Sequence, residues 1–407
     1  MAAVPLLVRR LTAVLVAVAA LAAPAGAQPD PFAARLQRAL VVPHVSLARS
    51  GAAVVDLASG ETVFTHNATL PLAPASNEKL LVTYGVLTEL GPSYRFETDV
   101  LGDGAQEGST WAGDLVLKGY GDPTLSSADL ASLASQVRAA GITHVAGGVV
   151  GDESWFDARR TSPGWKPSYY IEESPPLSAL AVDRARYGRS VSAQPALAAA
   201  ALFRTALRRA GVSVAGTART GVAADDAATL ASVDSPPLAA IVRGMDLVSD
   251  NYTAELLLKE LGAVDGGSGT TAAGATVLHG LLGQAGIPLA GVRIVDGSGL
   301  SLLDRLTPQA LVALLDAMWN DATLRPWLLR SLPVAGVSGT LADRLRSAPA
   351  RGHVRAKTGT TSVASALSGF ANDRFAFAVL ENGNPVPFWW ARVAQDRFAT
   401  VLASASE

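Results

Sequence analysis

The chain of 407 residues contains no cysteine. This absence excludes a disulfide framework, a zinc–thiolate site, a thiol nucleophile and a lipid-modified N-terminal cysteine. Charged residues are sparse, at 17% of the sequence, and their formal net charge is −2. Because there is no basic surplus, the composition favours neither a nucleic-acid partner nor an anionic membrane surface. Hydrophobic residues make up 49% of the chain, which suits a folded protein with a sizeable core.

Histidine is scarce, and its positions offer no catalytic base. The five histidines are His44, His66, His144, His279 and His353. None lies in an H-E-x-x-H motif, and the sequence has no G-x-S-x-G nucleophile elbow. The glycine-rich stretch at 261–274 lacks the lysine of a phosphate-binding loop, and the pair Glu172-Glu173 is typical of a solvated loop. We therefore expect no metal and no cofactor.

The N-terminus has the layout of a cleavable secretory signal. Arg9 and Arg10 precede an apolar run of Leu, Val and Ala, which ends in the small-residue pattern Ala25-Gly26-Ala27. The alternative is an uncleaved anchor, but the run is short for a span of about 20 residues. Residues 1–27 are therefore predicted to be removed, and the mature protein is expected to be exported and soluble, or loosely associated with the cell surface.

Strand-like segments lie near both ends of the mature chain, with helix-like segments between them. The β-prone runs 51–57 and 61–67 are joined by Ala58-Ser59-Gly60, a hairpin signal. Strands are also predicted within 352–370 and 374–383, and alanine- and leucine-rich helices within 195–211, 235–262 and 307–319. A sheet built from both ends would draw them into one domain and leave the middle as an excursion.

The excursion has its own texture. Residues 96–195 are rich in glycine and aspartate, with short β-prone runs interrupted by Trp, Pro and Tyr. We predict a smaller, β-rich inserted domain over 96–195. The segments 28–95 and 196–407 then form one discontinuous main domain, and the fold class is α/β (α+β).

Three short motifs occur in order along the chain: Ser76-x-x-Lys79, Ser249-Asp250-Asn251 and Lys357-Thr358-Gly359. The first opens an amphipathic helix that a glycine ends at residue 91, the second opens another helix, and the third lies on a strand. Each alone has a structural interpretation, as a helix cap or a strand end. Their joint occurrence in this order, behind a secretion signal, favours a catalytic interpretation.

The first motif supplies a nucleophile with its own base. Positions three apart on a helix share a face, so Lys79 can lie beside the Ser76 hydroxyl. Serine is a poor nucleophile until a base takes its proton, and lysine can be that base only if burial and nearby positive charge lower its pKa. Lys357 is a candidate for part of that charge. The backbone N–H groups of Ser76 and Thr360, with the helix N-terminus, would stabilise an oxyanion.

The other two motifs are suited to hold a substrate. We expect Ser249 to relay a proton to the leaving group and Asn251 to hydrogen-bond the substrate amide. Lys357 and Thr358 would hold an anionic carboxylate. Gly359 has no side chain, which would let a peptide or a lactam lie against the strand edge.

With these motifs the chain resembles the class C low-molecular-mass penicillin-binding proteins, the D-alanyl-D-alanine carboxypeptidase/endopeptidase family. The resemblance runs from about residue 40 to 400 and is carried by PASNEKLL, GDLVLKGYGDPTL, GDESWFD, SPGW, LSALAVD, LVSDNYTAELLLKELG, IVDGSGLS, LPVAGVSGTLADRL and VRAKTGTTSVASALSGF. It implies a penicillin-recognising serine transpeptidase/β-lactamase-like domain that extra domain material interrupts between the first and second motifs.

The resemblance also implies a reaction and a place. Ser76 would attack the carbonyl of the penultimate D-alanine of a peptidoglycan stem peptide, and water would hydrolyse the acyl-enzyme. In an endopeptidase mode the scissile bond would be the D-alanyl cross-link between stems. β-Lactams would acylate Ser76 as substrate mimics, and the protein would be secreted, periplasmic or in the cell-wall space of a bacterium.

The chain departs from the family's pattern in two places. The gap between the first two motifs, 249 − 76 = 173 positions, is short for the family, so the innermost inserted domain is expected to be reduced or missing. A basic residue tends to follow DGSGLS, where this chain has Leu302. In addition, Asp152 in GDESWFD matches a family position near the substrate side-chain pocket, and the alternative for it is a turn aspartate.

Two other functions share parts of this pattern. A β-lactamase carries the same motifs, but it needs a deacylating group, often in an E-x-x-L-N element that is not evident here, and it lacks a long insertion at this point. A non-catalytic wall-binding protein could keep the fold, but the three intact motifs argue against it.

Overall fold

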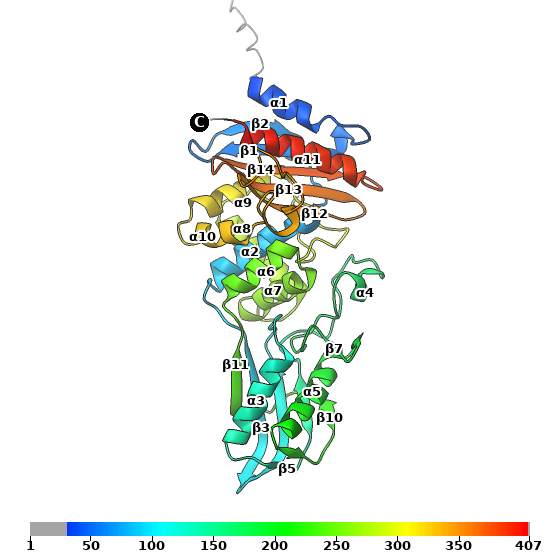
Figure 1. Cartoon of the computed structure of the whole chain (residues 1–407), viewed down its shortest axis with the longest axis vertical. Helices are drawn as coiled ribbons and strands as arrows, with labels where there is room; N and C mark the ends of the chain where they lie inside the picture. The colour runs from blue at the N-terminus through cyan, green and yellow to red at the C-terminus, as the bar shows by residue number, and fades with distance from the viewer. Residues whose placement is uncertain (1–30, 406–407) are drawn as a thin grey trace, which may run out of the picture.

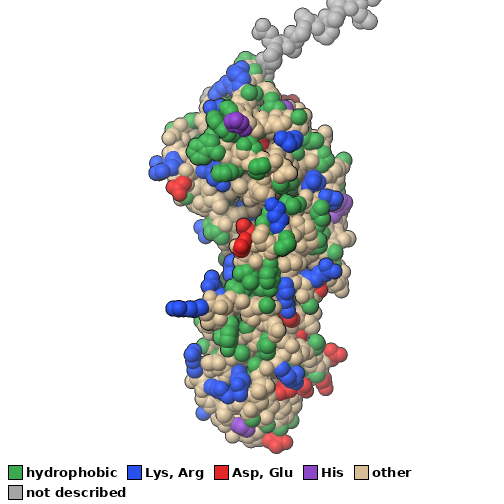
Figure 2. All heavy atoms as spheres, turned by 90° about the vertical axis from the view of Figure 1, so that its right-hand side faces the viewer, with side chains coloured by type: hydrophobic (Ala, Val, Ile, Leu, Met, Phe, Trp, Pro, Cys, Tyr) green, Lys and Arg blue, Asp and Glu red, His purple; other side chains and the backbone are tan. Residues whose placement is uncertain are grey.

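The computed structural model describes residues 31–405, so the predicted signal at 1–27 lies outside the described residues. The described chain forms two lobes stacked along the long axis of the molecule (Figure 1). Both chain ends lie in the upper lobe, and the middle of the chain forms the lower lobe. Figure 2 shows basic side chains spread along one face and acidic ones mostly near its lower end.

The main sheet joins the two ends of the chain, as predicted. Its five strands run in the order β12-β13-β14-β1-β2. Their bounds are β1 Ser50–Asp56, β2 Thr62–His66, β12 Val354–Thr360, β13 Ala364–Ala371 and β14 Phe375–Asn382. All neighbours are antiparallel, and β1 pairs with β14 along its whole length, from Ser50 opposite Glu381. The predicted hairpin of β1 and β2 is confirmed.

Helices cover both faces of the main sheet. Alternate residues of β1 face different cores, because side chains alternate along a strand: Ala53 packs with the internal helices, and Val54 packs beneath α1 and α11. The outer layer consists of α1 (Pro31–Leu40) and α11 (Phe388–Ala403), with the turn η1 (Leu47–Arg49). The inner helices are α2 (Glu78–Glu89), α6 (Leu238–Val248), α7 (Asn251–Val264), α8 (Thr271–Gln284), α9 (Pro308–Asn320) and α10 (Arg325–Ser331).

Helix α2 follows the predicted pattern. A 3₁₀ turn, η2 (Ala75–Asn77), leads into it, and its apolar stripe, including Leu80 and Leu87, is buried in the main core. Gly91 ends the helix with φ +81°, a left-handed conformation that glycine adopts without the penalty of a β-carbon.

The lower lobe is built on a second sheet with the strand order β10-β6-β4-β3-β11, to which β5 and β9 are added. The bounds are β3 Glu97–Glu107, β4 Thr110–Gly119, β5 His144–Val145, β6 Val149–Asp152, β9 Ser213–Val214, β10 Ala218–Thr220 and β11 Ala228–Asp234. Helices α3 (Ser127–Ala139) and α5 (Pro195–Arg209) pack on this sheet around buried Leu133 and Phe203. This lobe is the inserted excursion.

The predicted boundary at residue 195 falls too early. Strand β11 pairs with β3, so that Asp234 lies opposite Glu97, and Phe203 of α5 is fully buried in the lower core. The segment 196–234 therefore belongs to the lower lobe, which runs over 97–234. The alanine-rich sequence of α5 predicts a helix, but helical periodicity alone does not say on which sheet the helix packs.

A long connection reaches from the lower lobe back toward the main sheet. It begins after β6 and contains α4 (Tyr169–Glu172), which lies beside α6 and α7 in Figure 1. We call residues 160–175 the arm. An apolar cluster attaches this region to α7: Phe156 and Leu177 pack against Tyr252 of α7. The short hairpin of β7 (Arg186–Tyr187) and β8 (Ser190–Val191) follows.

Candidate active site

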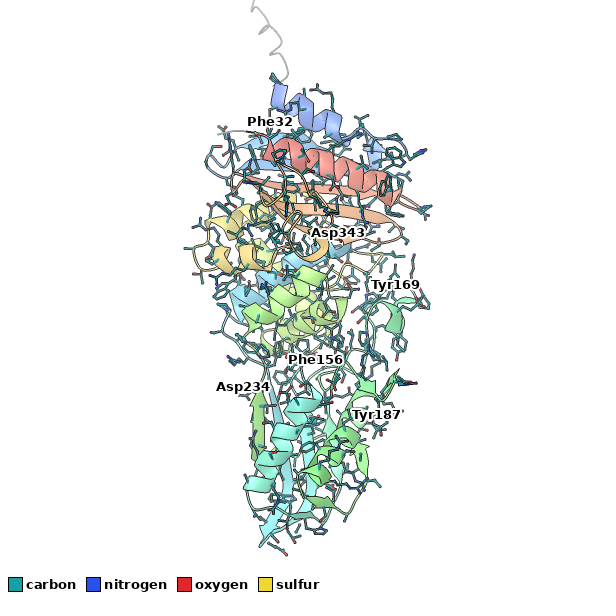
Figure 3. All side chains as sticks on the ribbon, viewed as in Figure 1. Phe32, Phe156, Tyr169, Tyr187, Asp234 and Asp343 are labelled. Atoms are coloured by element: carbon teal, nitrogen blue, oxygen red, sulfur yellow. The ribbon has the colours of Figure 1, made fainter. Side chains whose placement is uncertain are left out.

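The three sequence motifs meet at one cleft in the upper lobe. The cleft has a volume of about 720 Å³ and is lined by motif residues Ser76, Ser249, Asn251, Thr358 and Thr360. Its other walls are Glu173 of the arm, Leu300, Thr340 of η3 (Gly339–Leu341), the loop 343–346 and the first turns of α11. Figure 3 shows Asp343 of this loop in the upper lobe, above Tyr169 of the arm.

Ser76 and Lys79 are hydrogen-bonded at the start of α2. Ser76 lies in the turn η2 and is partly exposed to the cleft, whereas Lys79 is completely buried. The Nζ atom of Lys79 lies 3.0 Å from Oγ of Ser76. Ala75, with φ +48°, has the left-handed conformation immediately before the serine. Such a conformation is costly for a residue with a β-carbon and recurs at functional sites.

Lys79 has two further acceptors. Its Nζ atom donates to Oδ1 of Asn251 at 2.9 Å and to the carbonyl oxygen of Ser298 at 2.6 Å. Burial lowers the pKa of Lys79 to about 8, although the charges of Asp296 and Glu255 oppose that shift. A buried lysine with this pKa is partly unprotonated near neutral pH and can accept a proton.

Ser249 and Lys357 form the second hydrogen-bonded pair. Nζ of Lys357 donates to Oγ of Ser249 at 2.8 Å and to the carbonyl of Thr358 at 3.0 Å. Ser249 caps α6 with φ +61°, another left-handed residue in the cleft. Burial, and then the charge of Lys79, lower the pKa of Lys357 to about 7.

These pKa values change the role expected of Lys357. The sequence-based hypothesis gave it part of the positive charge that lowers the pKa of Lys79. Burial is the largest cause of the shift at Lys79, and burial also lowers the pKa of Lys357 itself, which weakens the positive charge that Lys357 can supply. Desolvation thus lowers the pKa of Lys79, an effect that the sequence analysis had assigned in part to a neighbouring positive charge.

The third motif lies on β12, the edge strand of the main sheet. The hydroxyl of Thr358 donates to Oγ1 of Thr340 at 2.7 Å, which ties the strand to η3. Gly359 also has a packing role that the sequence did not predict. A β-carbon there would lie 3.0 Å from Cβ of Ala75 and from the backbone N of Ser76, so the glycine lets β12 pack against the Ser76 turn.

The sequence predicts no role for the loop 296–301. In the structure this loop contacts Lys79 through the carbonyl oxygen of Ser298. Asp296 accepts hydrogen bonds from the backbone N–H groups of Gly299 and Ser301, both at 2.7 Å. Glu255 of α7 accepts from N of Ser298 at 2.8 Å. Both carboxylates are fully buried, and they fix the loop whose carbonyl contacts Lys79. In the sequence, only the family-like segment IVDGSGLS pointed to this loop, and no motif pointed to Glu255.

Glu78 is another carboxyl group near Lys79 that the sequence analysis did not single out. Its side chain is fully buried, and neither oxygen has a hydrogen-bond partner among the described residues. Burial, reinforced by the negative charges of Asp296 and Glu255, raises the pKa of Glu78 well above its usual value. Burial thus favours the neutral form of this carboxyl group, since an isolated buried carboxylate is very costly.

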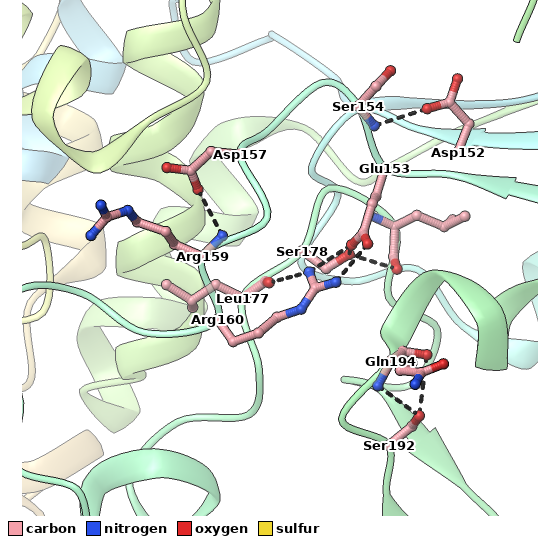
Figure 4. A network of polar contacts seen from close by, with 11 residues as sticks. Asp152, Glu153, Ser154, Asp157, Arg159, Arg160, Leu177, Ser178, Ser192 and Gln194 are labelled. Atoms are coloured by element: carbon pink, nitrogen blue, oxygen red, sulfur yellow. Dashed lines mark hydrogen bonds and ion pairs between the residues drawn. The ribbon is translucent and has the colours of Figure 1, made fainter. Parts of the chain in front are cut away.

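Asp152 lies outside the cleft. It is fully buried at the end of β6, and one of its oxygens accepts from N of Ser154 at 2.8 Å (Figure 4). The other oxygen accepts from N of Ala223 at 2.9 Å. The neighbouring Glu153 pairs with Arg160 in the same network. The structure therefore supports the turn interpretation of Asp152 and does not bring it to the cleft.

Leu302, which stands where the family tends to have a basic residue, contacts the arm through its backbone. Its N–H group donates to the carbonyl oxygen of Gly164 at 3.3 Å.

Two further features can be stated for residues 31–405. This part of the chain contains no group of three or more acidic, histidine or cysteine side chains arranged to hold a metal ion. Among its helices, none combines the length and the hydropathy that crossing a bilayer requires.

The fold, with the three motifs gathered at one cleft, is that of the penicillin-recognising serine enzymes. The chain belongs to the D-Ala-D-Ala carboxypeptidase 3 (S13) family, whose model matches residues 32–196 and 188–400. This membership confirms the family, the fold class and the serine-type carboxypeptidase activity that the sequence predicted.

Relatives and solved structures agree with this assignment. The chain is 32% identical to the D-alanyl-D-alanine carboxypeptidase of Actinomadura sp. (strain R39), over 94% of this chain and 86% of the relative. It is also 32% identical to carboxypeptidase DacB of Mycolicibacterium smegmatis, over 92% and 84%. Penicillin binding protein 4 (dacB) of Haemophilus influenzae has the same fold, with a TM-score of 0.79 at 22% identity over 91% of this chain and 98% of that one. That protein has also been solved with a β-lactam.

Proposed function

We propose that Ser76 is the nucleophile of a D-alanyl-D-alanine carboxypeptidase that trims peptidoglycan stem peptides. The observation that carries this proposal is the contact of 3.0 Å between Nζ of Lys79 and Oγ of Ser76 at the floor of the cleft. Unprotonated Lys79 takes the proton of Ser76, and Oγ attacks the carbonyl carbon of the penultimate D-alanine. The N–H groups of Ser76 and Thr360 bind the oxyanion that forms.

The leaving group departs on the other side of the cleft. Ser249, whose Oγ accepts from Lys357, passes a proton to the amine of the terminal D-alanine. Lys357 holds the carboxylate of that residue, and the hydroxyl of Thr358 turns its hydrogen from Thr340 to the same group. A carboxylate bound beside Lys357 also favours its protonated form, so substrate binding supplies a charged donor at the place where it is needed.

Asn251 serves the base and the substrate together. Its Oδ1 accepts from Lys79, and one hydrogen of Nδ2 goes to the carbonyl oxygen of Glu173 at 3.0 Å. The second hydrogen of Nδ2 is then available for the amide oxygen of the acyl part of the substrate. Water finally hydrolyses the acyl-enzyme and regenerates Ser76.

The same acyl-enzyme suits a DD-endopeptidase reaction. The two reactions share the D-alanyl acyl part and differ only in the amine that leaves, and the cleft continues past Thr358 to the loop 343–346. β-Lactams present a comparable carbonyl and carboxylate, so they would acylate Ser76. The substrate places the enzyme outside the cytoplasm, secreted, in the periplasm or in the bacterial cell-wall space.

The inserted region is short for this activity's family. The two ranges matched by the family model overlap at 188–196, which includes part of the hairpin β7–β8. The alignment with the Actinomadura enzyme spans 472 positions, more than the 407 residues of this chain. This supports an innermost inserted domain that is reduced to that hairpin.

The proposal predicts a particular pH dependence. Release of D-alanine from a stem pentapeptide ending in D-Ala-D-Ala should rise with pH through the pKa of about 8 of Lys79, because the base must be unprotonated. The measurement is the initial rate from about pH 6 to about pH 9. A cross-linked stem dimer in parallel measures the endopeptidase mode. No release at any pH, or rapid catalytic hydrolysis of benzylpenicillin instead, would contradict the proposal.

A further inference from the structure

Besides Ser76, Lys79 has two hydrogen-bond acceptors, and the arm supports both of them. These acceptors are Oδ1 of Asn251 and the carbonyl oxygen of Ser298. They come from different elements, one from the start of α7 and one from the loop 296–301. The arm belongs to the inserted region and yet reaches both of them.

The contact with Asn251 is direct. Nδ2 of Asn251 donates to the backbone carbonyl of Glu173, near the end of the arm, at 3.0 Å. An asparagine amide can flip, and the flipped side chain would present a donor to Lys79. The carbonyl of Glu173 accepts only from the amide nitrogen, so it fixes the orientation in which oxygen faces Lys79.

The contact with the Ser298 loop goes through two buried carboxylates. Nε1 of Trp165 donates to Oδ2 of Asp296 at 2.8 Å, and Oγ of Ser162 donates to Oε2 of Glu255 at 2.5 Å. Glu255 and Asp296 in turn accept the backbone N–H groups that shape the loop around Ser298. A buried carboxylate is stable only when donors satisfy it, so the arm helps to keep both carboxylates in place.

The arm is anchored well enough to do this. Its Gly164 carbonyl accepts from N of Leu302 at 3.3 Å, and Nζ of Lys166 donates to Oγ of Ser362, just beyond β12, at 2.6 Å. Trp165 also packs at the edge of the apolar cluster around Tyr252. The arm therefore spans from α7 to the main sheet across the back of the cleft.

We propose that Trp165 is a positioning residue for the reaction: its indole N–H holds Asp296, and Asp296 holds the loop whose Ser298 carbonyl orients Lys79. This inference rests on the proposed role of Lys79 as the base. A misplacement of a catalytic group by about 1 Å can cost about 100-fold in rate, so support at this distance is enough to matter.

The surroundings of Lys79 determine in which direction its pKa would shift if Trp165 were replaced. The groups that face it are Asp296 from the loop, Glu255 and Asp250 from α7, Asp246 from α6, Lys357 from β12 and Glu78 from α2 itself. If the Ser298 carbonyl moves away, the ammonium form of Lys79 loses an acceptor. Its pKa then falls, and the acid limb of the pH–rate profile moves to lower pH.

The experiment compares Trp165→Phe with Trp155→Phe. Trp155 is a matched control, because its indole also donates to a buried carboxylate, Oε2 of Glu260 at 2.9 Å, away from the groups that face Lys79. Each variant loses one indole–carboxylate hydrogen bond. The measurements are the rate of acylation by a chromogenic β-lactam as a function of pH and the thermal midpoint of each folded variant.

We expect Trp165→Phe to lower the acylation rate by about tenfold or more and to move its acid limb to lower pH. Trp155→Phe should lower the thermal midpoint similarly and leave rate and profile unchanged. Equal rates and profiles in the two variants would overturn the inference but not the proposed function. If Trp165→Phe does not fold, Ser162→Ala removes the arm's donor to Glu255, which accepts from N of Ser298, and tests the arm's support of the same loop with the same two outcomes. Failure of the unmodified enzyme to acylate would instead overturn the proposed function.

Discussion

Replacing Lys79 with methionine is expected to lower the rate of acylation by about 10³- to 10⁴-fold, the upper range for losing a general base. Methionine keeps an unbranched side chain in the buried site but cannot accept the proton of Ser76. It also leaves Oδ1 of Asn251 and the carbonyl of Ser298 without their shared donor. The measurement is the second-order rate constant of acylation by a chromogenic β-lactam, together with D-alanine release from the stem pentapeptide.

Lys259→Met is the matched control for this variant. Lys259 is also a buried lysine, 1% exposed, and its Nζ lies 2.5 Å from Oδ1 of Asp157, away from the cleft. Breaking this partly buried ion pair should destabilise the fold. The acylation rate should stay within about twofold of the parent rate, since the surroundings of the base are unchanged. If Lys79→Met acylated as fast as Lys259→Met, another group would have to be the base.

Gly299→Ala is expected to damage both the fold and the nucleophile. Gly299 has φ +78°, and a β-carbon there would lie 1.9 Å from the carbonyl oxygen of Ala75. That backbone atom cannot swing aside as a side chain could, so the turn that carries Ser76 must shift. We expect a loss of about 3 kcal/mol in the free energy of unfolding. We also expect acylation to fall by about 100-fold, because Oγ of Ser76 is displaced from Lys79.

Gly352→Ala separates the cost of the left-handed conformation from the cost of the clash with Ala75. Gly352 has the same φ of +78°, but nothing lies within 4 Å of the β-carbon position. This variant should lose only the conformational cost of about 1 kcal/mol and keep the parent acylation rate. The measurements are chemical denaturation and β-lactam acylation for both variants. Equal losses in the two would show that the contact with Ala75 does not hold the nucleophile in place.

The elements that could be predicted from the sequence are those with local signals. The β1–β2 hairpin follows from two β-prone runs around a glycine turn, and α2 follows from its apolar spacing and from Gly91. The three motifs could be placed on a helix start, a helix start and a strand. They could be expected to meet because the chemistry of acyl transfer needs a nucleophile, a base and a carboxylate site together.

What could not be predicted depends on contacts between distant segments. Helix α5 has the same alanine-rich pattern whichever sheet it packs on, so the boundary at 195 was wrong. Asp152 lies in a family-like segment, but its orientation is set by the amide of Ala223, which is 71 positions away. Glu255 and Asp296 have no motif spacing between them, and only the folded chain shows that both hold the Ser298 loop.

Gly359 has a packing role that its sequence context did not reveal. Its lack of a side chain was expected to make room for a substrate at the strand edge. The structure shows that the space is taken by the turn at Ala75 and Ser76, so the glycine brings the third motif up to the nucleophile. A sequence pattern indicates that a small residue is needed, but it does not identify the neighbour.

The central claim is that Ser76 forms an acyl-enzyme, and the most direct test is intact mass after incubation with benzylpenicillin. The parent enzyme should gain the mass of one penicilloyl group, mapped to the peptide that contains Ser76, and Ser76→Ala should gain none. Oγ of Ser249 also lies close to a lysine, at 2.8 Å from Nζ of Lys357, so mapping the adduct to its peptide distinguishes the two serines. An unmodified parent, or the same adduct on both proteins, would contradict the account and favour a non-catalytic wall-binding protein.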